Sequence, residues 1–321
     1  VCNLEMKKKI LIIGSGVLGA YLAKIFLEKQ NNFEIFVSSR YLKKKYKNYR
    51  YLKIDKKVKF IKLDILNVSQ INKKLIHLKP DAIYYFSGQS SIYKSYLKKK
   101  STIDSNFRGA KIFLNLIFKN KLQTKFFKAN SGYIFKSLRY TDNFQYSLVK
   151  PYNPYISSQI KAFKEIKRYR GLGVNCYSLI FFNVESPLKP PSFILNKVCN
   201  FVQREKRTTL KLGNINVIRD FSWAPEIMKG VFHVFDSKPQ DIIFASGKNY
   251  NLKDMIKFFF KLKKLNFAKH IKIDKKLYRK NEKINVSITN FRRNKLLVKS
   301  NWVPKIYGEK LIKKLYFSKK L

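Results

Sequence analysis

The sequence is poor in acidic residues, cysteine, histidine and long apolar runs, and each shortage excludes a class of protein. Its three cysteines lie far apart without a CxxC spacing, so they predict neither a disulfide framework nor a zinc site. The three histidines are isolated and have no metal-ligand spacing. No apolar run approaches the roughly 20 residues of a membrane-spanning helix, and the first six residues lack the apolar core of a signal peptide. We therefore expect a cytoplasmic protein without membrane association.

The shortage of acid leaves a large positive charge. Against 69 Lys and Arg stand 19 Asp and Glu, a formal net charge of +50, which would attract nucleic acid, anionic lipid or phosphorylated metabolites. The Lys excess runs the whole length together with Asn, Ile, Phe and Tyr, as drift in an AT-rich genome would produce. No basic tail or block stands out. We expect nucleic acid not to be a partner, and a basic nucleic-acid or membrane-surface binder is kept as a remote alternative.

The residues that are present indicate a globular α/β protein, since 45% of the 321 residues are hydrophobic. Strands alternate with helices, which predicts a Rossmann-type doubly wound parallel sheet. Strands are expected at 10–13, 33–38, 58–63, 82–87, 125–129 and 174–181, and helices at 17–29, 68–78, 101–119 and 153–169. After Pro187 a smaller, mixed α/β portion follows, with helices at 192–204, 224–235 and 251–264 and strands near 208–212 and 242–246. We expect a Rossmann domain at 6–185 and a ligand-binding portion at 186–321, with some chain crossing back to the sheet.

A glycine turn follows the first predicted strand and opens the first predicted helix. It reads Gly14-Ser-Gly16-Val-Leu-Gly19, and in this context glycines let the backbone approach a pyrophosphate at a helix N-terminus. The alternative is a turn that serves only tight packing. The second predicted strand ends in Val-Ser-Ser-Arg40 instead of an acid, which favours NADP over NAD, while a surface arginine is the alternative. Asp64 ends the third strand, where a carboxylate could meet an adenine amino group.

Four later segments are distinctive: Tyr84–Ser90 (YYFSGQS), Lys125–Ser131 (KFFKANS), Phe182–Pro187 (FNVESP) and Leu210–Phe221 (LKLGNINVIRDF). They resemble the motifs YNLAAQS, KFYQAST, FNHESP and LYLGNLDALRDW of the extended short-chain dehydrogenase/reductase family, most closely of its GDP-mannose 4,6-dehydratase branch. The similarity extends from about Lys8 to Pro304. It implies an NADP cofactor, a GDP-sugar ligand (GDP-mannose or its 4-keto-6-deoxy product) and, because the family associates through helix pairs, a homo-oligomer.

The resemblance also implies binding residues. The cofactor would be lined by Gly14, Gly16, Val17, Leu18, Gly19, Arg40, Asp64, Ile65, Phe86, Ser87, Gly88, Gln89, Ser90 and Lys189. The family spaces its glycines as GxxGxxG and this chain has Ile13 at the first position, so the turn is a variant. The nucleotide sugar would be held by Asn183, Lys197, Arg219 and Arg279, whose cations suit a diphosphate.

The resemblance places the catalytic tyrosine at Tyr155 and its hydroxyl partner at Ser131. In the family this tyrosine takes the proton of the sugar C4 hydroxyl while NADP⁺ accepts the hydride, and a lysine four residues on lowers the tyrosine pKa. Here Gln159 stands at the lysine position; it can still donate a hydrogen bond to the ribose but carries no charge. Lys161 would lie about 240° around the helix from Tyr155, so it is expected to face solvent.

Tyr133 stands where the family has the glutamate that removes the C5 proton. A normal phenol is almost wholly protonated at neutral pH and is a poor base. These residues therefore favour oxidation or reduction at C4 over elimination. Three interpretations stay open: a 4,6-dehydratase with replaced Glu and Lys, a reductase of a GDP-4-keto-6-deoxy sugar, or a pseudoenzyme that binds NADP and nucleotide sugar.

Overall fold

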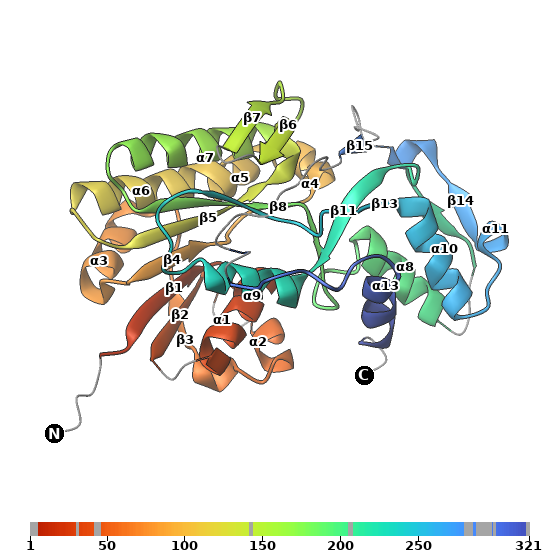
Figure 1. Ribbon diagram of the computed structural model, residues 1–321, viewed down its shortest axis with the longest axis horizontal. Helices are drawn as coiled ribbons and strands as arrows, with labels where there is room; N and C mark the ends of the chain where they lie inside the picture. Colours follow the sequence, from red (N-terminus) through yellow and green to blue (C-terminus); the bar gives the residue numbers. More distant parts are fainter. Residues whose placement is uncertain are drawn as a thin grey trace.

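The central feature of the fold is a parallel β-sheet. The computed structural model describes residues 6–29, 32–41, 46–140, 144–204, 208–278, 285–286, 297 and 300–318, apart from the side chains of 137–140, 144–145 and 285–286. Within these ranges a seven-stranded sheet has the order β12-β8-β5-β4-β1-β2-β3, with every neighbouring pair parallel (Figure 1). Its strands are β1 (Lys8–Ile13), β2 (Phe33–Ser39), β3 (Lys59–Lys62), β4 (Ala82–Tyr85), β5 (Lys125–Ser131), β8 (Cys176–Phe181) and β12 (Asp241–Phe244). The strand order reverses between β1 and β4, so the predicted doubly wound fold is confirmed.

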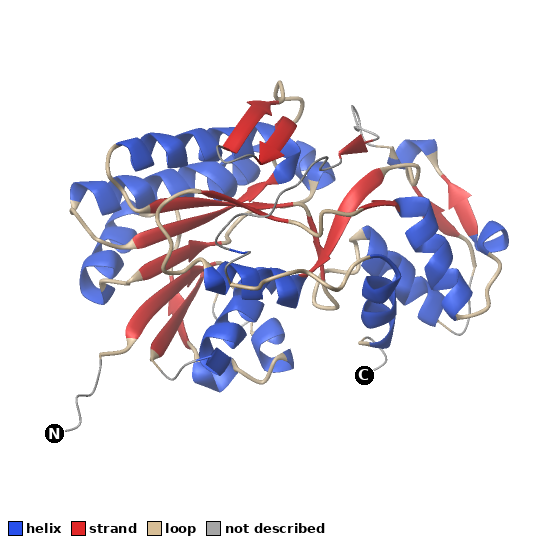
Figure 2. Cartoon of the chain, in the orientation of Figure 1, coloured by secondary structure: helices blue, strands red, loops and turns tan. Residues whose placement is uncertain are grey.

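Helices cover both faces of this sheet (Figure 2). One face is covered by α3 (Val68–Leu78), α6 (Gly109–Lys119) and α7 (Pro154–Gly171), which share a buried apolar cluster with β1, β4 and β5. The other face is covered by α1 (Val17–Lys29), α2 (Lys47–Tyr51) and α9 (Ala224–His233). Because parallel strands buried on both faces have no polar side, these strands read as near-continuous apolar runs.

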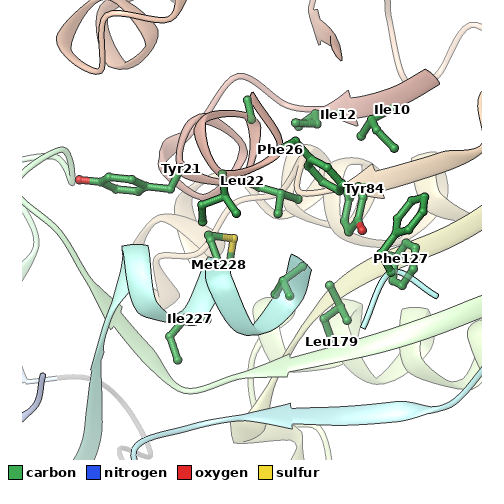
Figure 3. Close-up of a cluster of buried hydrophobic side chains, with 14 of the residues drawn as sticks. Ile10, Ile12, Tyr21, Leu22, Phe26, Tyr84, Phe127, Leu179, Ile227 and Met228 are labelled. Carbon is green, nitrogen blue, oxygen red and sulfur yellow. The ribbon is translucent and has the colours of Figure 1, made fainter. Parts of the chain in front are cut away.

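Aromatic side chains join the central strands beneath α1. Figure 3 shows Phe26 of α1 directed at Tyr84 of β4, next to Phe127 of β5. The Tyr84 and Phe127 rings stack at 4.6 Å, and Phe127 stacks on Tyr177 of β8 at 4.2 Å. Each such buried ring contributes roughly 1.5–3 kcal/mol by leaving water. The stack fixes β4, β5 and β8 relative to one another, and the ends of these strands carry the predicted site.

The segment between β4 and α7 differs most from the prediction. The helix expected at 101–119 is divided into α5 (Lys99–Ile103), a π-helical turn η2 (Asp104–Arg108) and α6. The polar sequence Asp104-Ser-Asn106 falls in this turn, and Asn106 is buried there. Helix α4 (Ile92–Leu97) and an antiparallel hairpin of β6 (Phe135–Tyr140) and β7 (Phe144–Leu148) had not been predicted.

The C-terminal portion has its own apolar core, formed by α8 (Ile194–Gln203), α10 (Leu252–Leu262) and α13 (Gly308–Phe317) with β10 (Leu210–Leu212). β10 pairs with β14 (Ile271–Ile273), which follows α11 (Phe267–His270). The long strand β11 (Ile218–Trp223) pairs with β9 (Asn183–Glu185), β13 (Asn249–Asn251) and β15 (Asn285–Val286). Since β9 directly follows β8, and α9 and β12 return to the Rossmann sheet, the two portions are tied together at the carboxyl edge of that sheet. Single 3-10 turns lie at Asp55–Lys57, Gly132–Ile134 and Lys275–Leu277.

Candidate active site

The three glycines between β1 and α1 have three different physical roles. Gly14 has φ +102°, and a Cβ there would lie 2.9 Å from the backbone nitrogen of Ser87. A Cβ on Gly19 would lie 2.8 Å from the Gly14 carbonyl oxygen, so Gly19 permits close packing of helix on strand. Gly16 is different, because a Cβ there would meet nothing within 4 Å. The turn therefore has one open position at the N-terminus of α1, where Val17 and Leu18 form the first helical residues.

The residues of this turn fit a dinucleotide phosphate. The Ser15 hydroxyl is buried and has no hydrogen-bond partner in the described structure. An unpaired buried hydroxyl is costly in a folded protein, and a bound phosphate oxygen would satisfy it. Open backbone at Gly16 and the partial positive charge of the helix end favour the same ligand.

At the end of β2 the Arg40 side chain is exposed, and its guanidinium lies 6.0 Å from the Tyr41 ring. The Ser39 hydroxyl donates to the Tyr41 carbonyl at 3.2 Å and accepts from the Tyr41 N–H at 3.4 Å. The hydroxyl beside Arg40 is thus already bonded to the backbone. Arg40 supplies the charge at this strand end.

Asp64 and Ile65 follow β3. One Asp64 oxygen accepts from the Leu66 N–H at 3.0 Å, while the Asp64 N–H donates to Gln70 at 2.7 Å. Ile65 packs so close to Gly109 of α6 that a Cβ on this glycine would lie 3.2 Å from it. Both predicted residues therefore also shape the β3–α3 turn.

The loop Phe86–Ser90 after β4 is connected to α7 through a residue that the sequence analysis missed. Asn106 of the π-helical turn donates to the Gln89 carbonyl and to the Ser158 hydroxyl, both at 3.1 Å. Ser158 in turn donates to the Tyr155 carbonyl at 2.7 Å. Asn106 thus ties the predicted cofactor loop to the predicted catalytic helix. The signal for it was the polar triplet inside an otherwise apolar helical pattern.

Tyr155 and Ser131 come together as the resemblance implied. Asn153 caps α7 by accepting from the Ile156 N–H at 2.8 Å, which places Tyr155 in the first turn of the helix. Burial raises the pKa of Tyr155 to about 12, although a hydrogen bond with Ser131 opposes the rise. Gln159 is buried, and its Oε1 has no partner among the described residues. An uncharged side chain therefore stands where a cation would lower the pKa of the phenol.

Tyr133 is bonded to another predicted site residue. Its hydroxyl donates to Asn183 Oδ1 at 3.0 Å, and Asn183 Nδ2 donates to the Asp220 carbonyl at 2.9 Å. The Arg219 guanidinium lies 5.6 Å from the centre of the Tyr133 ring. Tyr133, Asn183 and Arg219 thus form one group between the strand ends of the Rossmann sheet and β11.

Asp220 fixes the strand β11 that carries Arg219 of this group. It is fully buried and accepts hydrogen bonds from Ser222 Oγ at 3.0 Å, Ser246 N at 3.1 Å, Ser246 Oγ at 2.8 Å and Gly247 N at 2.8 Å. Burial raises the pKa of this carboxyl against the effect of the four donors. Since Arg219 precedes Asp220 on β11, the anchored carboxyl fixes the strand that carries the cation.

Of the remaining predicted cations, Lys189 donates to Glu185 at 2.8 Å and lies 4.3 Å from the Phe193 ring. Lys197 of α8 donates to the Lys211 carbonyl at 2.8 Å. Arg279 lies outside the described residues. Lys161 is exposed, as predicted.

The described ranges contain neither a helix suited to crossing a bilayer nor a cluster of metal ligands. None of the helices there combines the length and apolar character that a bilayer crossing requires. No group of three or more His, Cys, Asp and Glu in the same ranges could hold a metal ion.

The glycine turn, the doubly wound sheet and the Ser131–Tyr155 pair define a short-chain dehydrogenase/reductase of the epimerase/dehydratase type. The chain belongs to the GDP-mannose 4,6 dehydratase family, whose sequence model matches residues 11–315. It is 27% identical over 259 residues to GDP-mannose 4,6 dehydratase 1 of Arabidopsis thaliana, covering 78% of this chain and 71% of that protein. In fold it is similar to DesIV, a dTDP-glucose 4,6-dehydratase from Streptomyces venezuelae with NAD and TYD bound (TM-score 0.81, 15% identity, 97% and 98% of the two chains). It is also similar to RMD from Pseudomonas aeruginosa complexed with NADPH (TM-score 0.74, 16% identity, 97% and 98% of the two chains).

Proposed function

We propose that this protein catalyses NADP-dependent hydride transfer at C4 of a GDP-linked hexose, working as a 4-keto reductase and without the elimination of water that its relatives' names imply. Family membership supports the GDP-sugar, and the glycine turn with Arg40 supports the phosphorylated dinucleotide. The observation that carries the proposal is the Ser131–Tyr155 hydrogen bond, in which burial raises the pKa of the Tyr155 phenol, together with the phenol of Tyr133 at the position of the family's glutamate.

A bound nicotinamide would supply the hydride; the protein's own residues handle the proton. With its pKa raised to about 12, the Tyr155 phenol keeps its proton at neutral pH and can give it to a C4 carbonyl oxygen. Ser131 Oγ, which also accepts from the Tyr133 N–H at 3.2 Å, orients the same oxygen. The reverse step, removal of a proton from a C4 hydroxyl, would need the phenolate that burial disfavours. At neutral pH the phenol is therefore in the protonation state that reduction of a C4 carbonyl requires.

The second half of a dehydratase reaction needs a base at C5, and Tyr133 is poorly suited to that role. Its hydroxyl donates to Asn183, and the neighbouring guanidinium of Arg219 lies over its ring. Arg219 and Lys197 are suited to the diphosphate of the substrate, since charge-assisted hydrogen bonds are the strong kind. The group around Tyr133 therefore binds and orients the sugar nucleotide.

Complete 4,6-dehydration is the second candidate, because the family match covers nearly the whole chain. The two are separated by incubating the pure protein with a GDP-4-keto-6-deoxy hexose and NADPH, and in parallel with GDP-mannose and NADP. We expect NADPH oxidation in the first reaction and no 4-keto-6-deoxy product in the second. Product from GDP-mannose would establish the dehydratase, and binding of both ligands by calorimetry without turnover in either reaction would establish a pseudoenzyme.

The cofactor preference is tested at Arg40. We expect Arg40→Ala to weaken NADPH binding about tenfold or more, because the guanidinium is the charge placed to meet a 2′-phosphate. NADH lacks this phosphate, so its affinity should change by less than about twofold. Calorimetric titration of both cofactors measures the difference, and Arg50→Ala, an exposed arginine on α2, is the control. Equal losses for NADPH and NADH would contradict a 2′-phosphate contact.

A further inference from the structure

Lys128 is a buried cation that the proposed chemistry has not used. It lies in the middle of β5 and is only 1% exposed. Its ammonium donates to the Ala129 carbonyl and lies 5.5 Å from the Tyr85 ring, and no carboxylate of the described residues is within salt-bridge distance. Burial lowers the pKa of Lys128 to about 7. Buried lysines without an acidic partner are rare because desolvation of the charge is costly.

The register of the sheet places Lys128 on the face covered by α6 and α7. Lys128 is opposite Tyr85 on β4 and Ser178 on β8. Tyr85 belongs to the apolar cluster that β4 and β5 share with α6 and α7. Side chains alternate along a strand, so Asn130 faces the same way as Lys128. Asn130 Nδ2 donates to Ser178 at 2.6 Å, and its Oδ1 is buried without a partner among the described residues.

Helix α7 brings Gln159 to the same level. The helix begins with the Tyr155–Ser131 hydrogen bond, and further along it Ile166 packs in one cluster with Phe126. From Tyr155 to Ile166 a helix rises about 16 Å. From Ser131 back to Phe126 a strand spans about 16 Å as well. Helix α7 and strand β5 therefore run antiparallel and cover equal distances between these two contacts.

Gln159 lies about 6 Å along α7 from Tyr155, a rise that corresponds to roughly two strand residues. This places it level with Ala129, between Lys128 and Asn130. Gln159 and Ile166 are two helical turns apart and share the face that is directed at the sheet. Two buried oxygens that have no partner in the described part of the chain, Gln159 Oε1 and Asn130 Oδ1, thus lie in the same short stretch between β5 and α7 as the buried ammonium of Lys128.

We propose that Lys128 is a positioning residue of this active site, whose ammonium serves the orphaned oxygens of Gln159 and Asn130 through ordered water. Bound at its oxygen, the Gln159 amide directs its N–H groups away from Lys128 and towards the Tyr155 end of the layer. In the family this positive charge is on a lysine of the helix, whereas here it is on Lys128 of β5. The link between Lys128 and Gln159 stands on the geometry alone, whereas its catalytic effect rests on the proposed function.

The link is tested without any assay of activity. Lysine labelled with ¹³C at Cε, with Lys128 assigned by its loss in Lys128→Met, gives the pKa of Lys128 by NMR titration. We expect Gln159→Lys to lower this pKa by about 1 or more, because a second cation nearby disfavours the first. Gln159→Leu should also lower it by removing the acceptor. Lys161→Gln, on the exposed side of α7, is the control and should change nothing. A Lys128 pKa that stays at its wild-type value in both Gln159 variants would overturn the proposal.

Lys128 is the group expected to titrate near pH 7 in this layer. Burial raises the pKa of Tyr85 and raises those of Tyr155 and Cys176 to about 12 each. The surrounding elements also carry Tyr169 and three ion-paired sets: Asp104 with Arg108, Glu165 with both Lys111 and Arg168, and Arg170 with Asp241. The lysines of α7 (Lys161, Lys164 and Lys167) are exposed.

The catalytic effect is tested by moving the cation. We expect Lys128→Gln to lower kcat for C4 reduction about tenfold with little change in KM. The double variant Lys128→Gln with Gln159→Lys should recover most of this loss, since the charge returns to the same layer from the helix side. A purely structural lysine would give no such recovery. An unchanged kcat in Lys128→Gln would overturn the catalytic part, and wild-type protein without turnover would count against the proposed function while the titration still decides the link.

Discussion

Replacing Tyr155 with phenylalanine is expected to lower kcat for NADPH-dependent C4 reduction by about 10²–10⁴, because it removes the proton donor of the reaction. The ring would keep its place in the first turn of α7, so KM for the GDP-sugar and the affinity for NADPH should change by less than about twofold. Absorbance of NADPH during turnover measures the first quantity, and calorimetry measures the second. Loss of cofactor binding together with activity would indicate damage to the fold.

The neighbouring Tyr152 provides the matched control. Tyr152 is half-buried and lies close enough to Tyr155 to raise the pKa of the Tyr155 phenol. Tyr152→Phe should leave kcat within about twofold of the wild type. If Tyr155→Phe also retained activity, Tyr155 would not be the proton donor.

The raised pKa of Tyr155 also predicts the pH profile. The active form of a proton donor is the protonated one, so the rate falls only as pH rises through its pKa. With that pKa at about 12, the Tyr155 phenol contributes no alkaline decline between about pH 7 and 10. Rates measured over this range in the Lys128→Gln variant, which lacks the buried amine, should therefore be flat.

The second large effect is expected on stability. Asp220→Ala should lower the free energy of unfolding by about 3–5 kcal/mol, because the Ser246 and Gly247 N–H groups lose their acceptor and a small void is left. Urea denaturation measures the change. Since Asp220 anchors β11 beside Arg219 and its carbonyl accepts from Asn183, the affinity for the GDP-sugar should fall in the same variant.

Two variants show whether the buried acceptor is the cause. Asp220→Asn keeps the shape and one acceptor oxygen, so it should cost about half as much. Asp236→Ala removes a carboxylate that is mostly exposed and paired with Lys125 at 3.2 Å, and it should cost less than about 0.5 kcal/mol. Similar losses in Asp220→Ala and Asp236→Ala would contradict the role assigned to burial.

Local pattern was sufficient for most of the Rossmann sheet. The helices at 17–29 and 68–78 have the predicted bounds, because apolar residues at helical spacing recur there without interruption. The 101–119 helix was wrong as a single element, since the π-helical turn depends on Asn106 reaching Gln89 and Ser158. Such a turn is stabilised by partners distant in sequence, and periodicity does not contain them.

The sequence by itself determined the fold class, the glycine turn and the family, because strand, turn and helix signals are local and the motifs are contiguous. The resemblance also marked Tyr155, Ser131, Gln159 and Tyr133 as catalytic positions, and these roles stay predictions. Only the tertiary structure decided what these side chains touch. Tyr133 bonds to Asn183, and among the described residues the Gln159 oxygen has no hydrogen-bond partner and the buried Lys128 has no acidic one. The physical reason is that elements distant in sequence set the burial and the hydrogen-bond partners of a side chain. Burial and partners in turn set the pKa of the Tyr155 phenol and of the Lys128 amine.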